Sequence, residues 1–211
     1  VYPSKLITNG RIVSKKFTLA KRVYLDDTIT DSLVYGPGWM WDEGDEWYSA
    51  EVSGLSVNDN CIDFIIGPST PGSLISVETY PKSNYYKINN SAITVSDTSE
   101  YDKIKIIRDW KNKKNIFQIS GTILDTSSTD TLIRNISNPT MFTGNLFYQM
   151  LIDKGLQISE LKKGIYKGSG LLIATHRSKS LLSSLENLMV ESDNLTAELL
   201  VKMIGYESVK N

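Results

Sequence analysis

The sequence holds one cysteine and one histidine, and each scarcity excludes a class of site. A single cysteine, Cys61, allows neither an internal disulfide nor a cysteine-based zinc site, and the apolar run CIDFIIG around it predicts a small core residue. A single histidine, His176, excludes a zinc site built on several imidazoles. A Ser-His-Asp triad would have to use it, but its place after LLIA favours a structural role at a strand end. We expect neither a metal nor a cofactor.

An excess of charge of one sign is also missing. The 23 lysines and arginines and the 24 aspartates and glutamates give a net charge of -1. Because the basic residues are spread along the chain, a nucleic-acid partner is not expected. No apolar run approaches the length of a membrane span, and no signal peptide opens the chain. The chain begins with Val1-Tyr2 instead of methionine, so we interpret it as a piece of a longer protein.

The middle of the chain shows strand signals only. Short β-branched or aromatic runs such as CIDFIIG, KIKIIRDW and NIFQISGTIL are separated by Gly, Pro, Asn, Asp and Ser. NIFQISGTI alternates apolar and polar residues, so one face of that strand should be buried, and DWKNKKNIF predicts a hairpin with a basic tip. We therefore predict a mostly antiparallel β module at residues 58–136. It would be inserted in an α+β sub-domain formed by residues 1–57 and 137–168.

Helical signals follow the β module. Asn138-Pro139 opens a predicted helix that Gly155 stops. The predicted apolar face of this helix consists of Phe142, Leu146, Met150 and Leu151. The runs LQI and LLIATH are predicted as strands. Two leucine-rich helices then close the chain, the second of them ended by Gly205, and Ser192-Asp193-Asn194 lies at the joint between them.

This triplet has two interpretations. Ser, Asp and Asn satisfy free backbone amides at helix ends, so they belong at a joint for structural reasons alone. S-D-N is also the second motif of the penicillin-recognising serine enzymes, after S-x-x-K and before K-T-G. There a neutral lysine can accept the proton of the serine nucleophile, and the serine of S-D-N can relay it to the leaving amine. The asparagine amide can hold both the lysine and the substrate backbone.

Three longer stretches favour the second interpretation. GPGWMWDEGDEWYSAEVSGLSVNDN resembles the P-G-W-x-W-D-D…Y-S-A signature of the D-alanyl-D-alanine carboxypeptidase/endopeptidase family, the class C low-molecular-mass penicillin-binding proteins (DacB-like, peptidase S13). NPTMFTGNLFYQMLIDKGLQI and ATHRSKSLLSSLENLMVESDNLTAELLVKMIG are similar to later segments of that family, in the same order. The resemblance implies an α+β fold with a β-rich inserted module. Residues 169–211 would be part of a penicillin-binding-protein/β-lactamase-like catalytic domain.

The resemblance also implies roles for single residues. Ser192 would be the proton-relay hydroxyl, Asn194 would orient lysine and substrate, and Asp193 would brace the turn. The tryptophan-rich loop would meet the free amino end of a peptidoglycan stem peptide, because a carboxylate pairs with an ammonium and an aromatic face helps to hold it. The residues implied for this task are Trp41 as a wall, Asp42 as a neighbouring acid, and Glu43 and Tyr48 as the direct partners.

The loop has a plainer interpretation as well. Its tryptophans could be core anchors, a role that we favour for Trp39 and Trp47, and its acids a solvated rim. The run DEGDE lacks the pattern of an EF-hand, so a calcium site is not expected.

The family's S-x-x-K and K-T-G motifs are absent at their places before the loop and after S-D-N. Ser159-Glu160-Leu161-Lys162 matches S-x-x-K by letters but lies too late in the chain. We therefore expect this chain to be inactive, although its parent would act on peptidoglycan peptides and be acylated by β-lactams. The expected location is periplasmic or extracellular, with peripheral association with wall or membrane. The alternative is a non-catalytic, extracytoplasmic β-rich module that binds cell wall or a protein partner.

Overall fold

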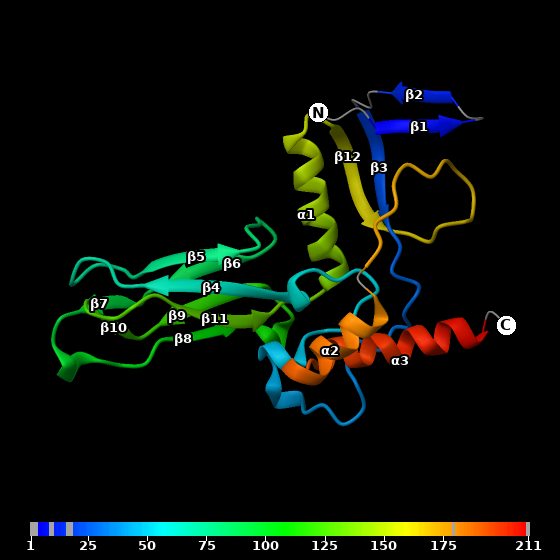
Figure 1. The fold of residues 1–211 in the computed structure, drawn as a ribbon. Coiled ribbons are helices and arrows are strands. Elements are labelled where there is room, and N and C mark those ends of the chain that lie inside the picture. Colours follow the sequence, from blue (N-terminus) through cyan, green and yellow to red (C-terminus); the bar gives the residue numbers. More distant parts are fainter. Residues whose placement is uncertain (1–3, 9–10, 16–18, 179, 210–211) are drawn as a thin grey trace.

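The computed structural model describes the backbone at residues 4–8, 11–15, 19–178 and 180–209, and the side chains at residues 19–40, 42–178 and 180–208. Strands β4 to β11 form an elongated lobe, α1 stands upright beside it, and α2 and α3 lie below α1 (Figure 1). The mixture of helices and strands confirms the predicted α+β class. The α-helices are α1 (Pro139–Asp153), α2 (Leu181–Glu191) and α3 (Asn194–Val209). The short 3₁₀ helices are η1 (Trp41–Glu43), η2 (Trp47–Ser49), η3 (Asn58–Asn60), η4 (Thr98–Glu100) and η5 (Trp110–Asn112).

The strands of the lobe pair in three groups. The sheet β11-β4-β5 is antiparallel, the sheet β6-β9-β8 holds one parallel and one antiparallel pair, and β7 pairs with β10 in parallel. The module is thus mostly antiparallel, and β8 and β9 form the predicted hairpin. Its strands are β4 (Cys61–Gly67), β5 (Ser76–Tyr80), β6 (Lys87–Asn90), β7 (Ile93–Val95), β8 (Lys105–Arg108), β9 (Ile116–Ser120), β10 (Thr122–Leu124) and β11 (Asp130–Asn135). The predicted domain limits stay a prediction.

Alternation along the strands builds the core of the module. Phe117 and Ile119 of β9 are fully buried while Gln118 between them is exposed, which confirms the predicted buried face. The rings of Phe64 on β4 and Phe117 lie 4.9 Å apart between centroids. Each such side chain contributes roughly 1.5–3 kcal/mol through removal from water. Cys61 is buried as predicted, and this burial raises the pKa of its thiol.

Helix α1 begins and ends where the sequence predicts. Asn138 accepts a hydrogen bond from the amide of Met141 at its N-cap, at 3.3 Å, and Pro139 occupies the first turn. Gly155 follows the helix with a φ of +86°, a conformation that glycine adopts without strain. One predicted face residue is wrong: Met150 is 66% exposed, because the lobe contacts only the first half of the helix.

A second face of α1 covers the parallel pair β3 (Leu19–Leu25) and β12 (Gln157–Lys163). Gly144 permits this contact, since a Cβ there would lie 2.1 Å from Cδ1 of Leu25. An antiparallel hairpin of β1 (Ser4–Thr8) and β2 (Arg11–Lys15) precedes β3. Helix α1 therefore ties the β module to the rest of the chain.

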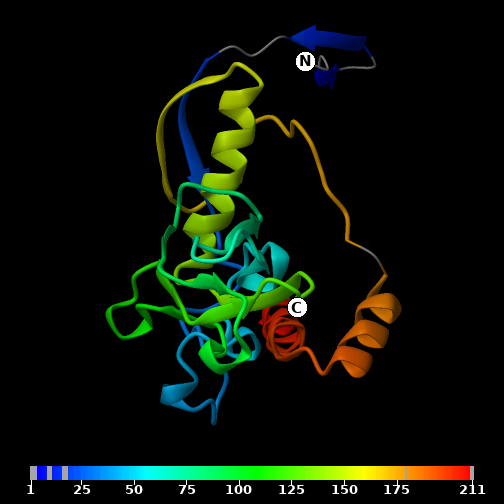
Figure 2. The same cartoon turned by 90° about the vertical axis from the view of Figure 1, so that its left-hand side faces the viewer.

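The C-terminal part corrects two predictions. Residues 171–176 (LLIATH) form no strand, because no described strand lies beside them to accept their backbone hydrogen bonds, and Figure 2 shows this connection standing clear of the rest. His176 is consequently exposed and not at a strand end. Helix α3 does not stop at Gly205 but continues to Val209. Within the described residues, no helix is both long and apolar enough to cross a membrane.

Candidate active site

The tryptophan-rich loop is fixed to the β module by one asparagine. Asn135, at the end of β11 and 1% exposed, donates hydrogen bonds from its side-chain amide to three loop carbonyls. The acceptors are the oxygens of Gly44 at 3.3 Å, Glu46 at 2.8 Å and Ser49 at 3.2 Å. Because buried carbonyls need such partners, this side chain holds η1 and η2 in place.

Two arginines of the module add further contacts to the loop. The backbone amide of Arg108, on β8, donates to a carboxylate oxygen of Asp45 at 2.6 Å, and its guanidinium donates to the carbonyl of Gly44 at 3.2 Å. Arg134 of β11 forms an ion pair with Glu46 at 3.4 Å. Neighbouring strands of the module therefore both hold residues 44–49.

The S-D-N triplet lies at the joint of α2 and α3, as predicted. Ser192 ends α2 in a left-handed conformation with a φ of +55°, and its amide donates to the carbonyl of Leu188. Asp193 accepts from the amide of Thr196 at 3.1 Å and from its hydroxyl, so it braces the turn as the family resemblance implies. Helix capping accounts for Asp193.

Asn194 links this joint to the tryptophan-rich loop. Its side-chain amide donates to the backbone carbonyl of Tyr48 at 3.0 Å, across 146 residues of sequence. Both side chains line a cavity of about 400 Å³, together with Trp47, Asp59 and Glu191. The structure thus brings together one residue of each predicted group.

The other residues that the sequence analysis singled out lie elsewhere or have a different environment from the one predicted. Ser192 is exposed beside this cavity but does not line it, and Glu43 and Asp42 do not line it either. The side chain of Trp41 lies outside the described residues. Trp47 is not the predicted core anchor: its side chain is 46% exposed and meets the Tyr48 ring edge-on, with centroids 5.7 Å apart.

Trp39 sits partly buried beside a neighbouring ring. It packs against Tyr35, with ring centroids 6.2 Å apart. Its position therefore agrees better with the predicted role of a core anchor than that of the exposed Trp47 does.

The acids of the loop act on Tyr48. Partial desolvation and the charges of Glu46, Glu43 and Asp42 raise the pKa of the Tyr48 phenol. The hydroxyl is therefore protonated at neutral pH and lies in a negative field, which would attract an ammonium group.

Asp59 is a site residue that the sequence did not single out. It lies in η3, within three successive residues of left-handed conformation, and its exposed side chain lines the cavity. Desolvation, and then the charges of Asp193 and Asp63, raise the pKa of this carboxyl. The only sequence signal was the run VNDN, whose Asn and Asp residues tolerate a positive φ.

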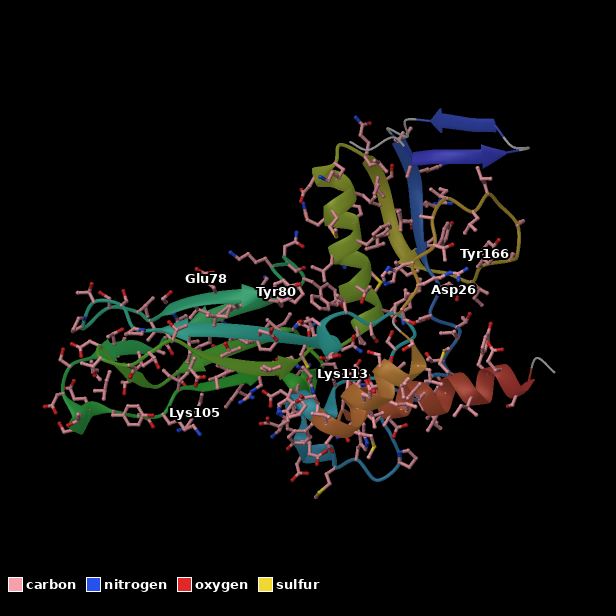
Figure 3. All side chains as sticks on the ribbon, in the orientation of Figure 1. Asp26, Glu78, Tyr80, Lys105, Lys113 and Tyr166 are labelled. Atoms are coloured by element: carbon pink, nitrogen blue, oxygen red, sulfur yellow. The ribbon has the colours of Figure 1, made fainter. Side chains whose placement is uncertain are left out.

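Replacing Asp59 with asparagine should stabilise the chain at neutral pH. A carboxyl whose pKa is raised in the folded state favours its protonated form there, so its contribution to stability is present at low pH and is lost as pH rises through the folded pKa. The asparagine side chain would carry no charge, and it tolerates the same left-handed backbone. We expect a higher Tm for Asp59→Asn at pH 7 and no difference below about pH 4. Glu78→Gln, an exposed change on β5, is the control, and equal shifts in both variants would contradict the explanation (Figure 3).

The letters S-x-x-K at Ser159 and Lys162 fall on β12. Residues three apart share a face on a helix but point to opposite faces of a strand, so the hydroxyl and the ammonium cannot meet. Lys162 instead pairs with Glu160 at 3.2 Å. This match is accidental, as the sequence position indicates.

Comparison with known proteins gives these features a family context. The sequence model of the D-Ala-D-Ala carboxypeptidase 3 (S13) family matches residues 16–211. A D-alanyl-D-alanine carboxypeptidase of Actinomadura sp. (strain R39) is 26% identical over an alignment of 205 residues, which covers 90% of this chain and 37% of that protein. The chain thus spans less than half of this relative.

Solved structures show the same fold. Penicillin-binding protein 4 (dacB) from Haemophilus influenzae matches 90% of this chain and 42% of its own, with a TM-score of 0.70 and 17% identity. A complex of that protein with a novel β-lactam matches 71% of this chain and 35% of its own, with a TM-score of 0.50 and 18% identity. These matches place the predicted α+β architecture in a penicillin-binding-protein fold. With the family model covering nearly all of the sequence, the chain belongs to the D-Ala-D-Ala carboxypeptidase 3 (S13) family.

Proposed function

We propose that this chain is part of a serine D-Ala-D-Ala carboxypeptidase/endopeptidase that cuts peptidoglycan stem peptides through an acyl-enzyme. The observation that carries the proposal is the hydrogen bond from the Asn194 amide to the Tyr48 carbonyl, because it seats the S-D-N joint on the tryptophan-rich loop. The cavity beside this bond would receive the stem peptide.

The chain would supply two of the functions that such a reaction needs. Ser192 is proposed to relay the proton of the nucleophile to the leaving amine, and Asn194 to orient the lysine base and the peptide backbone. The negative field of Glu43, Glu46 and Asp42 around Tyr48 would hold the ammonium end of the substrate. The nucleophile and its lysine are not in this sequence at the family's positions, so the chain alone is expected to be inactive.

The proposal extends to inhibitors and location. A serine that is acylated by a D-Ala-D-Ala peptide would also be acylated by β-lactams, and the substrate places the parent protein in the periplasm or outside the cell. Peripheral association with wall or membrane is part of the same proposal.

Labelling of the whole protein with a fluorescent penicillin tests the proposal. The wild-type protein should become covalently labelled, and Ser192→Ala should lower the labelling rate by about a hundredfold because the proton relay is lost. Ser208→Ala, an exposed serine near the end of α3, is the matched control and should label at the wild-type rate.

Two results would contradict the proposal. A whole protein that takes up no label would favour the alternative of a non-catalytic module that binds cell wall or a protein. If Ser192→Ala is labelled at the wild-type rate, Ser192 takes no part in the proton relay and serves only as the C-cap of α2.

A further inference from the structure

A second cavity lies between the tryptophan-rich loop and the tip of the β8–β9 hairpin. Its volume is about 260 Å³, and it has no lining residue in common with the cavity beside Asn194. It is lined by three aromatic side chains, Tyr35, Trp39 and Trp110. The apolar part of a ligand could therefore pack against several aromatic rings.

The charged residues of this cavity are mainly positive. Arg108, Lys111 and Lys113 line it, opposed by the single acid Glu51. The Lys111 ammonium lies 5.5 Å from the centre of the Trp110 ring, and this cation–π contact holds the ammonium beside the cavity. Among the described residues, neither Lys111 nor Lys113 has an ion pair, and Figure 3 shows Lys113 at the junction of the β module with the helices.

Glu51 does not neutralise this charge by direct contact. Its carboxylate accepts from the hydroxyl of Ser137 at 2.7 Å, the amide of Asn138 at 2.9 Å and the hydroxyl of Tyr35 at 3.5 Å. No described ion pair joins it to Arg108. Its oxygens are thus engaged by neutral donors and it keeps its charge, and the charges of Asp45 and Asp109 also act on Arg108. Among the residues that line the cavity, three cations still face this one acid.

Arg108 is the most informative residue of the set. It is 2% exposed, and its Nε and Nη1 atoms are buried without a hydrogen-bond partner, although Nη2 donates to Gly44 and Asn135. A guanidinium stays charged in a protein, and a buried charge without a full set of partners is unfavourable. Because water does not screen it there, its field acts strongly on the cavity beside it.

We propose that this cavity binds the carboxylate of a small organic acid, with the body of the acid against the aromatic rings. Lys111 and Lys113 would contact the carboxylate, and the charge of the buried Arg108 guanidinium would attract it as well. A carboxylate fits better than a phosphate, because Glu51 repels the single charge of a carboxylate less than the two charges of a phosphate. The site is separate from the cavity beside Asn194 and uses no residue of the S-D-N joint, although part of the tryptophan-rich loop lines both cavities.

Titration of this chain with benzoate, followed by NMR of the tryptophan indole N–H groups, tests the proposal. Benzoate should shift the indole signals of Trp39 and Trp110 saturably, and benzamide, of the same shape but uncharged, should bind at least about tenfold more weakly. The double variant Lys111→Gln/Lys113→Gln should weaken benzoate binding by about fivefold or more. Lys105→Gln, which changes an exposed lysine of β8 farther out on the lobe, should have no effect (Figure 3).

The rim lysines are exposed, so their loss should not unfold the chain, and far-UV circular dichroism checks this. The proposal is wrong if benzoate causes no saturable shift of the indole signals, or if benzamide binds as tightly as benzoate. Unchanged binding in the double variant would also overturn it. Tighter binding of inorganic phosphate would overturn the assignment to carboxylates. None of these outcomes depends on penicillin labelling, so failure here is distinct from failure of the proposed function.

Discussion

Phe142→Ala should lower the free energy of unfolding of this chain by about 3–5 kcal/mol. Phe142 projects from α1 and is fully buried in the core formed mainly by strands of the β module. Its ring lies 5.9 Å from that of Tyr85. Alanine would remove the apolar contacts and leave a cavity that close-packed neighbours fill only in part. Urea denaturation followed by circular dichroism measures the change.

Phe147→Ala is the matched control for this prediction. Phe147 lies on the same helix but is 51% exposed, so its truncation should change stability by no more than about 0.5 kcal/mol. Similar losses in both variants would contradict burial in the core as the cause, because alanine forms helices better than phenylalanine and truncation does not weaken the helix itself. A loss confined to Phe142→Ala would show that α1 and the β module unfold together.

Local sequence signals predicted the elements that local chemistry determines. The N-cap of α1 at Asn138, its stop at Gly155 and the alternation along β9 each depend on residues that are near one another in sequence. The joint at Ser192-Asp193 was predictable for the same reason. These features would be expected in almost any fold that contains the segments.

Predictions failed where a distant partner decides the structure. The apolar run of residues 171–176 reads as a strand, but a strand forms only beside another strand, and none of the described strands lies next to it. Met150 continues the apolar face of α1 beyond the end of the lobe that covers it. Trp47 is apolar enough for a core but lies on a turn at the cavity.

The candidate site could be predicted only in part, because its contacts cross long stretches of sequence. Asn194 and Tyr48 were expected together from the family resemblance, and their hydrogen bond spans 146 residues. Arg108 and Asp45 are 63 residues apart, and no periodicity or spacing motif marks such a pair. Asn135 has no local signature at all, although it holds the tryptophan-rich loop.

Asn135→Ala should have the second large effect, a loss of about 3 kcal/mol or more in the free energy of unfolding. The substitution would leave the Ser49 carbonyl without its described partner. It would also take one partner from the Gly44 carbonyl, the Glu46 carbonyl and Nη2 of Arg108, although the bond between Arg108 and Gly44 and the bonds from Ser49 to Glu46 remain. The unpaired carbonyl costs about 1–3 kcal/mol and each of the other lost hydrogen bonds about 0.5–1.5 kcal/mol, while relaxation of the loop toward water would recover part of the sum. Asn89→Ala, an exposed change on β6, should leave stability unchanged.

Hydrogen exchange distinguishes a positioning role of Asn135 from a purely structural one. If its amide holds the loop, the backbone amides of residues 44–49 should exchange much faster in Asn135→Ala, while those of the central strand β9 keep most of their protection. Uniformly faster exchange across the chain would mean that Asn135 supports the fold in general. Selective loosening would move the Tyr48 carbonyl, to which Asn194 donates, so a single buried amide of the β module would then control how the tryptophan-rich loop meets the S-D-N joint.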